Sequence, residues 1–151
     1  MQVANACFAA GAPHLEPTRS VRMHGTRPRF VPVGADLPAV LASVSRSLLA
    51  DFQTVAVISP LTRLEGLVDL LRLLGVPVDP PGVAARPGHL ALVPPADAKG
   101  LESDAVVVLE PAAFLPLPGG PGLLYIAVSR AVQHLSVVHE APLPPGLAPA
   151  A

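Results

Sequence analysis

Two short segments in the C-terminal half of the chain combine residue types that could bind a nucleotide. The first, Ala98–Glu110, places the only lysine of the sequence, Lys99, beside Gly100 and Glu102 and ahead of a valine-rich strand. In open α/β sheets, ligands gather in the loops at the carboxyl ends of strands. A carboxylate held near a strand end is the usual acceptor for a ribose hydroxyl. We therefore interpret this turn as a candidate binding site.

The second segment, Gly122–Glu140, places an arginine between a predicted helix and the last predicted strand. The pattern predicts the helix at Leu123–Val132, with Arg130 inside it, and the strand at Leu135–His139. A guanidinium can present a rigid set of donors to phosphate oxygens. An arginine that contacts a transferring phosphoryl group contributes roughly 10³–10⁵ in rate. The two segments could thus offer a carboxylate to a ribose and a guanidinium to a phosphate.

Both segments also have a purely structural interpretation, which the residues alone leave open. Lys99 and Glu102 could form a solvated ion pair across a turn, which contributes less than about 1 kcal/mol. Arg130 could be an ordinary cation at a helix C-terminus, complementing the helix dipole.

Read together and in order, the two segments resemble the last two signature motifs of superfamily 1 helicases of the UvrD/Rep type. Lys99 to Asp104 resembles the family pattern Lys-Gly-Leu-Glu-Phe-Asp, and Leu124 to Ala131 resembles Leu-Tyr-Val-Ala-Leu-Thr-Arg-Ala. The resemblance implies the second RecA-like lobe of a motor, a mainly parallel sheet flanked by helices of the P-loop NTPase type. We expect this domain to span residues 1–140, followed by a frayed, Pro/Ala-rich tail at 141–151.

The resemblance also implies a role for each matched residue. Glu102 is expected to bind the ribose of ATP, and Arg130 to reach the γ-phosphate as the catalytic arginine. Lys99 and Gly100 are expected to shape the nucleotide-binding loop, while Tyr125 and Ser129 support the site.

The chain departs from the family pattern at three positions. Ser103 replaces the family's phenylalanine, and Pro94 and Ala96 replace a threonine and a histidine that face single-stranded DNA. Neither of the latter two side chains offers a donor, which speaks against a contact to DNA. The local sequences Val93–Ala98 and Val137–Pro144 look most like those of HelD-type relatives, which act on bacterial RNA polymerase. Two alternatives stay open: a lobe of a DNA-unwinding helicase that binds single-stranded DNA, and a truncated, non-catalytic binding module.

The sequence lacks the groups that would hold the triphosphate and Mg²⁺. It has no Gly-x-x-x-x-Gly-Lys-Ser/Thr loop and no Asp-Glu pair after a strand. The glycines of Gly119–Gly122 precede no lysine and indicate a turn that leads into a helix. The family's Asn-Tyr-Arg motif would lie upstream of Met1. We therefore expect an N-terminal motor lobe to supply the phosphate loop and the magnesium ligands, and no ATP turnover by this chain in isolation.

The rest of the chain predicts alternating strands and helices, and hence a parallel sheet. The expected elements, in order, are a helix at Met1–Gly11, a loop at His14–Pro28, an edge strand at Arg29–Val33, a helix capped by Asp36, a buried strand at Thr54–Ser59, a leucine-rich helix at Thr62–Leu74 packed along most of its length, and strands at His89–Val93 and Ala105–Leu109.

Composition limits the class of protein. The chain has 151 residues, which suit one domain, and its formal net charge of −1 gives no basic surface for nucleic acid. The single cysteine, Cys7, fits a reducing cytoplasm, and no apolar run reaches the roughly 18–20 residues of a membrane span. His134 and His139 lack further ligands at metal-binding spacing.

Overall fold

The computed structural model describes residues 27–147, which form a five-stranded sheet with parallel neighbouring strands. The strand order is β1-β5-β4-β2-β3. The bounds are Arg29–Pro32 for β1, Val55–Ile58 for β2, Leu90–Val93 for β3, Ser103–Leu109 for β4 and Ala131–His139 for β5. This arrangement confirms the predicted α/β class. The predicted helix Met1–Gly11 and all but the end of the predicted loop His14–Pro28 lie outside the described residues.

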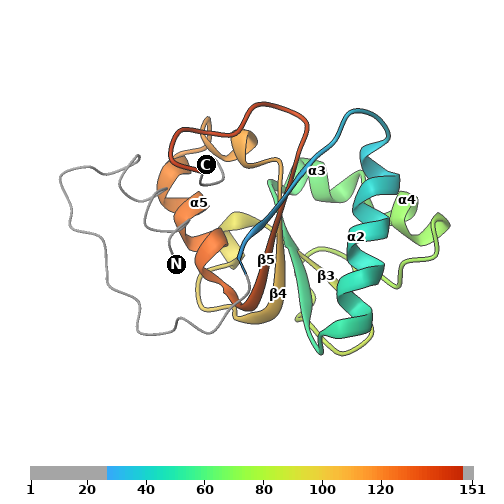
Figure 1. Ribbon diagram of the computed structural model, residues 1–151. Helices are drawn as coiled ribbons and strands as arrows, with labels where there is room; N and C mark the ends of the chain where they lie inside the picture. Colours follow the sequence, from blue (N-terminus) through green and yellow to red (C-terminus); the bar gives the residue numbers. More distant parts are fainter. Residues whose placement is uncertain (1–26, 148–151) are drawn as a thin grey trace.

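Helices cover both faces of the sheet (Figure 1). On one face lie α2 (Leu37–Asp51), α3 (Leu61–Glu65) and α4 (Val68–Leu73), and on the other lies α5 (Gly120–Ser129). Side chains alternate along β4, so Val107 packs with the first group of helices and Val106 with α5. The sheet is therefore the middle layer between two hydrophobic clusters.

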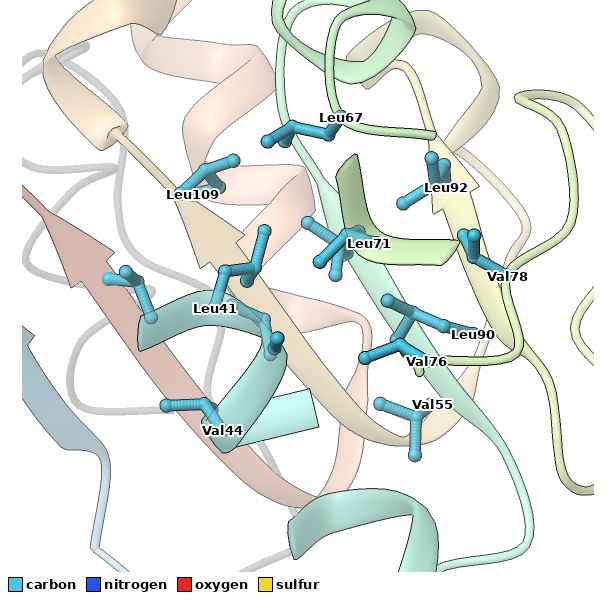
Figure 2. Packing of buried hydrophobic residues seen from close by; sticks show 14 of the residues in the cluster. Leu41, Val44, Val55, Leu67, Leu71, Val76, Val78, Leu90, Leu92 and Leu109 are labelled. Atoms are coloured by element: carbon cyan, nitrogen blue, oxygen red, sulfur yellow. The ribbon is translucent and has the colours of Figure 1, made fainter. Parts of the chain in front are cut away.

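The first cluster contains the apolar face of α2, the helix whose cap the sequence predicted. Asp36 caps this helix, because its side chain accepts a hydrogen bond from the Ala39 amide at 3.2 Å. Leu41, Val44 and Leu48 are buried, and Figure 2 shows the first two packed beside leucines of β3, β4 and α4. The cap and the apolar face together fix this helix on the sheet.

The predicted single helix Thr62–Leu74 is wrong in two respects. It is divided into α3 and α4 around Gly66, a residue that destabilises helix interiors. It also does not pack along most of its length: Leu64 and Leu71 are fully buried, whereas Leu73 is 83% exposed. A helix with leucines on several sides can bury only those that face the sheet.

The boundary between α5 and β5 differs from the prediction as well. The helix ends at Ser129 rather than Val132, and the strand begins at Ala131 rather than Leu135. The Ser103 amide donates to the Arg130 carbonyl at 3.2 Å, so strand pairing with β4 starts directly after the helix. Arg130 is thus the residue between the two elements, not a residue inside the helix.

At the carboxyl edge of the sheet, where the parallel strands end, Glu110 binds the segment that follows β5. This residue has a left-handed backbone, with φ 52°, and is only 3% exposed. Its carboxylate accepts hydrogen bonds from the amides of Glu140 at 2.9 Å and Ala141 at 3.1 Å. Beyond them, Leu147 is fully buried in the cluster beside α5. The expectation of a frayed tail is therefore wrong for residues 141–147.

Candidate nucleotide-binding site

Glu102 and Arg130 lie at the same edge of the sheet, next to each other in the strand order. Glu102 directly precedes β4, Arg130 directly precedes β5, and these two strands are hydrogen-bonded neighbours. Because the strands are parallel, both residues lie at the amino edge. This corrects the expectation, based on the general rule for α/β sheets, of a site at the carboxyl ends of strands.

The backbone fixes the spacing of the two residues. The residue after Glu102 donates its amide hydrogen to the carbonyl of Arg130, which links the two positions directly. The pairing shifts at this point: Ser103 pairs with Ala131, whereas Ala105 pairs with His134, so β5 takes three steps while β4 takes two. Such β-bulges bend a strand locally and can re-aim a side chain at a site.

Arg130 is partly buried and incompletely hydrogen-bonded. Its Nη2 donates to the Ser129 hydroxyl at 3.2 Å. Its Nε is buried and has no hydrogen-bond partner among residues 27–147. Buried polar groups are nearly always paired, so this donor is suited to an acceptor from outside the described chain.

The turn before β4 exposes the other predicted residues. The Leu101 amide donates to the Ala98 carbonyl at 3.1 Å, and Gly100 has a φ of 87°, which closes a type II turn. Lys99 and Glu102 are both exposed, and in the described part of the chain they form no ion pair with each other. The structural interpretation of an ion pair across this turn therefore has no support here.

Three further polar residues of this edge, Thr54, Ser103 and Asp104, had no predicted role in the site. Asp104 and Thr54 bind reciprocally: the Thr54 amide donates to the Asp104 carboxylate at 3.3 Å, and the Asp104 amide donates to the Thr54 hydroxyl at 3.0 Å. This pair joins the amino ends of β2 and β4. Ser103 is 1% exposed, and its hydroxyl has no partner within residues 27–147. The polarity of Ser103 and Asp104 ahead of an apolar run was the available signal.

Glu102 is thus anchored through both of the residues that follow it. The Ser103 amide ties it to β5, and Asp104 ties it to β2. The side chain of Glu102 is itself exposed to solvent, where its carboxylate can accept hydrogen bonds from a ribose.

A small hollow lies farther along the same edge, near the amino ends of β2 and β3. Its volume is about 200 Å³, and its lining comes from Leu49–Gln53 and Pro87–Gly88. Neither Glu102 nor Arg130 lines it.

His134 stands on the same edge and adds no permanent charge to it. Its ring stacks on Phe52 with centroids 5.8 Å apart, and its Nε2 lies 2.8 Å from the Ser136 hydroxyl. Burial, and secondarily the positive charge of Arg29, lowers the pKa of His134 below its usual range. The ring is therefore neutral near neutral pH.

The described part of the chain contains neither a candidate metal site nor a helix that could span a membrane. Within residues 27–147, no group of three or more His, Cys, Asp or Glu side chains could hold a metal ion. Over the same range, every helix is too short or too polar to cross a bilayer.

Comparison with known proteins relates the fold to a helicase domain. No protein-family model matches the sequence, and no curated protein matches it. Among solved structures, the chain is similar to the C-terminal domain of a possible DNA helicase from Lactobacillus plantarum WCFS1. The identity is 25%, the TM-score is 0.70, and the match covers 98% of this chain and 89% of the other. The similarity supports a helicase C-terminal domain.

Proposed function

We propose that the chain is the C-terminal lobe of a superfamily 1 helicase-like ATPase and contributes half of an ATP site. The observation that carries the proposal is the placement of Glu102 and Arg130 on neighbouring strands of one edge, linked by the hydrogen bond from the Ser103 amide to the Arg130 carbonyl. Glu102 binds the ribose. Arg130 contacts the γ-phosphate and stabilises the charge that develops during phosphoryl transfer.

The other half of the site belongs to an N-terminal motor lobe. That lobe supplies the phosphate loop and the ligands of Mg²⁺, for which this sequence has no motif. Lys99 and Gly100 form the turn that faces it. The exposure of both residues to solvent supports this assignment. The left-handed backbone of Gly100 also allows another group to approach the chain closely.

Nucleotide binding by the isolated chain can be tested by titrating ¹⁵N-labelled protein with MgATP. We expect shift changes restricted to the amides of residues 99–104 and 129–131. Glu102→Gln and Arg130→Ala should weaken them, whereas Glu65→Gln and Arg63→Ala, two exposed residues of α3, should not. Shift changes elsewhere, or none at any accessible concentration, would contradict the proposal.

Catalysis requires a protein in which this chain is joined to a phosphate-loop lobe. There, Arg130→Ala should lower kcat by roughly 10³–10⁵, with little change in KM, because an arginine of this kind acts in the transition state. Glu102→Gln should instead raise KM. An unchanged kcat in the Arg130→Ala protein would remove that residue from the site.

The target that we favour is RNA polymerase, as for HelD-type motors. The support is local: Pro94 is partly buried, Ala96 is exposed, and neither side chain can donate a hydrogen bond to DNA. The second candidate is a DNA helicase lobe that binds single-stranded DNA, which the description of the L. plantarum structure favours. Co-purification with RNA polymerase, beside a titration of single-stranded DNA at several salt concentrations, distinguishes the two.

A further inference from the structure

Ser129 makes two hydrogen bonds at the end of α5, and together they give its hydroxyl a fixed direction. The hydroxyl donates to the Ile126 carbonyl oxygen at 2.8 Å and accepts from Arg130 Nη2 at 3.2 Å. A hydroxyl has a single hydrogen, so the first bond determines where its lone pairs point. Ile126 belongs to the last helical turn, whose carbonyls have no partner within the helix. The guanidinium is thereby tied to the rigid end of α5.

The rest of the guanidinium is prepared for an acceptor that the described residues do not provide. Within residues 27–147, Nε is buried and unpaired, and the guanidinium has no hydrogen-bond partner other than the Ser129 hydroxyl. No acidic side chain forms an ion pair with it in that part of the chain. A long, charged side chain normally keeps its rotamer freedom unless a partner holds it. Here the Ser129 hydroxyl restrains the guanidinium, while the buried Nε has no partner among residues 27–147.

We propose that Ser129 is a positioning residue that holds Arg130 ready for a phosphate oxygen of a nucleoside triphosphate. This inference rests on the proposed function. By holding Nη2 in the free chain, Ser129 restricts the rotation of the guanidinium at the end of the helix. Binding then does not have to immobilise the arginine, so less free energy is lost when the phosphate arrives.

Two substitutions of Ser129 test this proposal. Ser129→Ala removes both hydrogen bonds, whereas Ser129→Thr keeps a hydroxyl at the same position. Ser47→Ala, which removes an exposed serine of α2, is the matched control. Arg130→Ala identifies the signal of Arg130 in spectra of the arginine Nε–H groups.

The first readout needs no ligand. The Nε–H signal of Arg130 should be slow to exchange with water in the wild-type, Ser129→Thr and Ser47→Ala chains. In Ser129→Ala its exchange should accelerate several-fold, while that of Arg86, whose Nε donates to Asp79 at 2.9 Å, should stay unchanged. Equal exchange of the Arg130 signal in wild type and Ser129→Ala would overturn the positioning role.

The second readout is the ratio of affinities for ATP and AMP, in which general effects on folding cancel. Ser129→Ala should lower this preference about two- to tenfold, because one immobilised side chain has become free. Ser129→Thr should retain it, and Arg130→Ala should abolish it. An unchanged ratio in Ser129→Ala would overturn the proposal. Absence of nucleotide binding by the wild-type chain would overturn the proposed function and the phosphate part of this inference, while the Nε–H signal would still decide whether Ser129 holds the guanidinium.

Discussion

Replacing Glu110 should destabilise the domain, and glycine should be tolerated there better than alanine. The carboxylate is 3% exposed and accepts two backbone hydrogen bonds, at 2.9 and 3.1 Å, from the segment that follows β5. Hydrogen bonds to charged groups contribute about 1.5–3 kcal/mol each, and part of this returns when the freed amides meet water. We therefore expect Glu110→Ala to lower the free energy of unfolding by about 2–4 kcal/mol.

The difference between the two small residues follows from the backbone. Glu110 has a φ of 52°, a conformation that costs a residue with a Cβ about 1–2 kcal/mol. Glycine avoids this cost but loses about 0.4–1 kcal/mol more chain entropy on folding. The strain term is the larger, so Glu110→Gly should be more stable than Glu110→Ala by roughly 0.5–1 kcal/mol. At an ordinary helical position the order is the reverse.

Urea unfolding followed by circular dichroism is the suitable assay, because the chain has no tryptophan. Glu140→Ala is the matched control, since it removes a neighbouring carboxylate that makes none of these bonds, and it should stay within about 0.5 kcal/mol of wild type. Hydrogen exchange at the amides of Glu140 and Ala141 should accelerate in both Glu110 variants. A Glu110→Ala protein that is as stable as wild type, or more stable than the Glu110→Gly protein, would refute the reasoning.

Two further predictions concern a helix start and a buried carboxylate. A Cβ at Gly120 would lie 2.2 Å from the Phe114 carbonyl oxygen, whereas one at Gly122 would meet nothing within 4 Å; Gly120→Ala should therefore unfold at clearly lower urea, and Gly122→Ala at unchanged or higher urea. Asp79 accepts two hydrogen bonds of 2.9 Å from Arg86, and chiefly for that reason its pKa is lowered from 3.8. Its stabilising effect is present above that value and lost as the pH falls through the folded-state pKa, so the Tm difference between wild type and Asp79→Asn should narrow below about pH 4 and vanish in stronger acid. Equal urea midpoints for the two glycine variants would contradict the first expectation. A Tm difference between wild type and Asp79→Asn that does not change with pH would contradict the second.

The sequence was informative where hydrophobic periodicity and proline act locally. The apolar strands that contain Val57 and Val107 are buried as predicted. The edge position indicated by Pro32 is confirmed, because among the described strands β1 pairs only with β5. The capping role of Asp36 is confirmed for the same reason, since a cap depends on the few residues beside it. The glycines of Gly119–Gly122 lead into α5, as their lack of a following lysine indicated.

The errors arose where distant contacts decide the structure. The start of β5 depends on the Ser103 amide of another strand, so the local helical pattern around Val132 could not reveal it. Leu147 is buried against α5, although its Pro/Ala-rich surroundings predict a frayed tail. The many leucines of Thr62–Leu74 predicted packing along most of the helix, but the direction in which a short helix meets the sheet decides which of them are covered.

The two edges of the sheet show why a general rule failed for the candidate site. At the carboxyl edge, Glu110 uses its carboxylate on the chain's own backbone, and the residues after β5 pack over that end. At the amino edge, Asp104 and Thr54 bind each other, Glu102 is exposed, and Arg130 Nε has no partner among residues 27–147. Unsatisfied donors and exposed acceptors, rather than strand direction, mark the edge that can still bind something. The ATP site that we propose would need such an edge, because the groups that complete it would come from outside the domain.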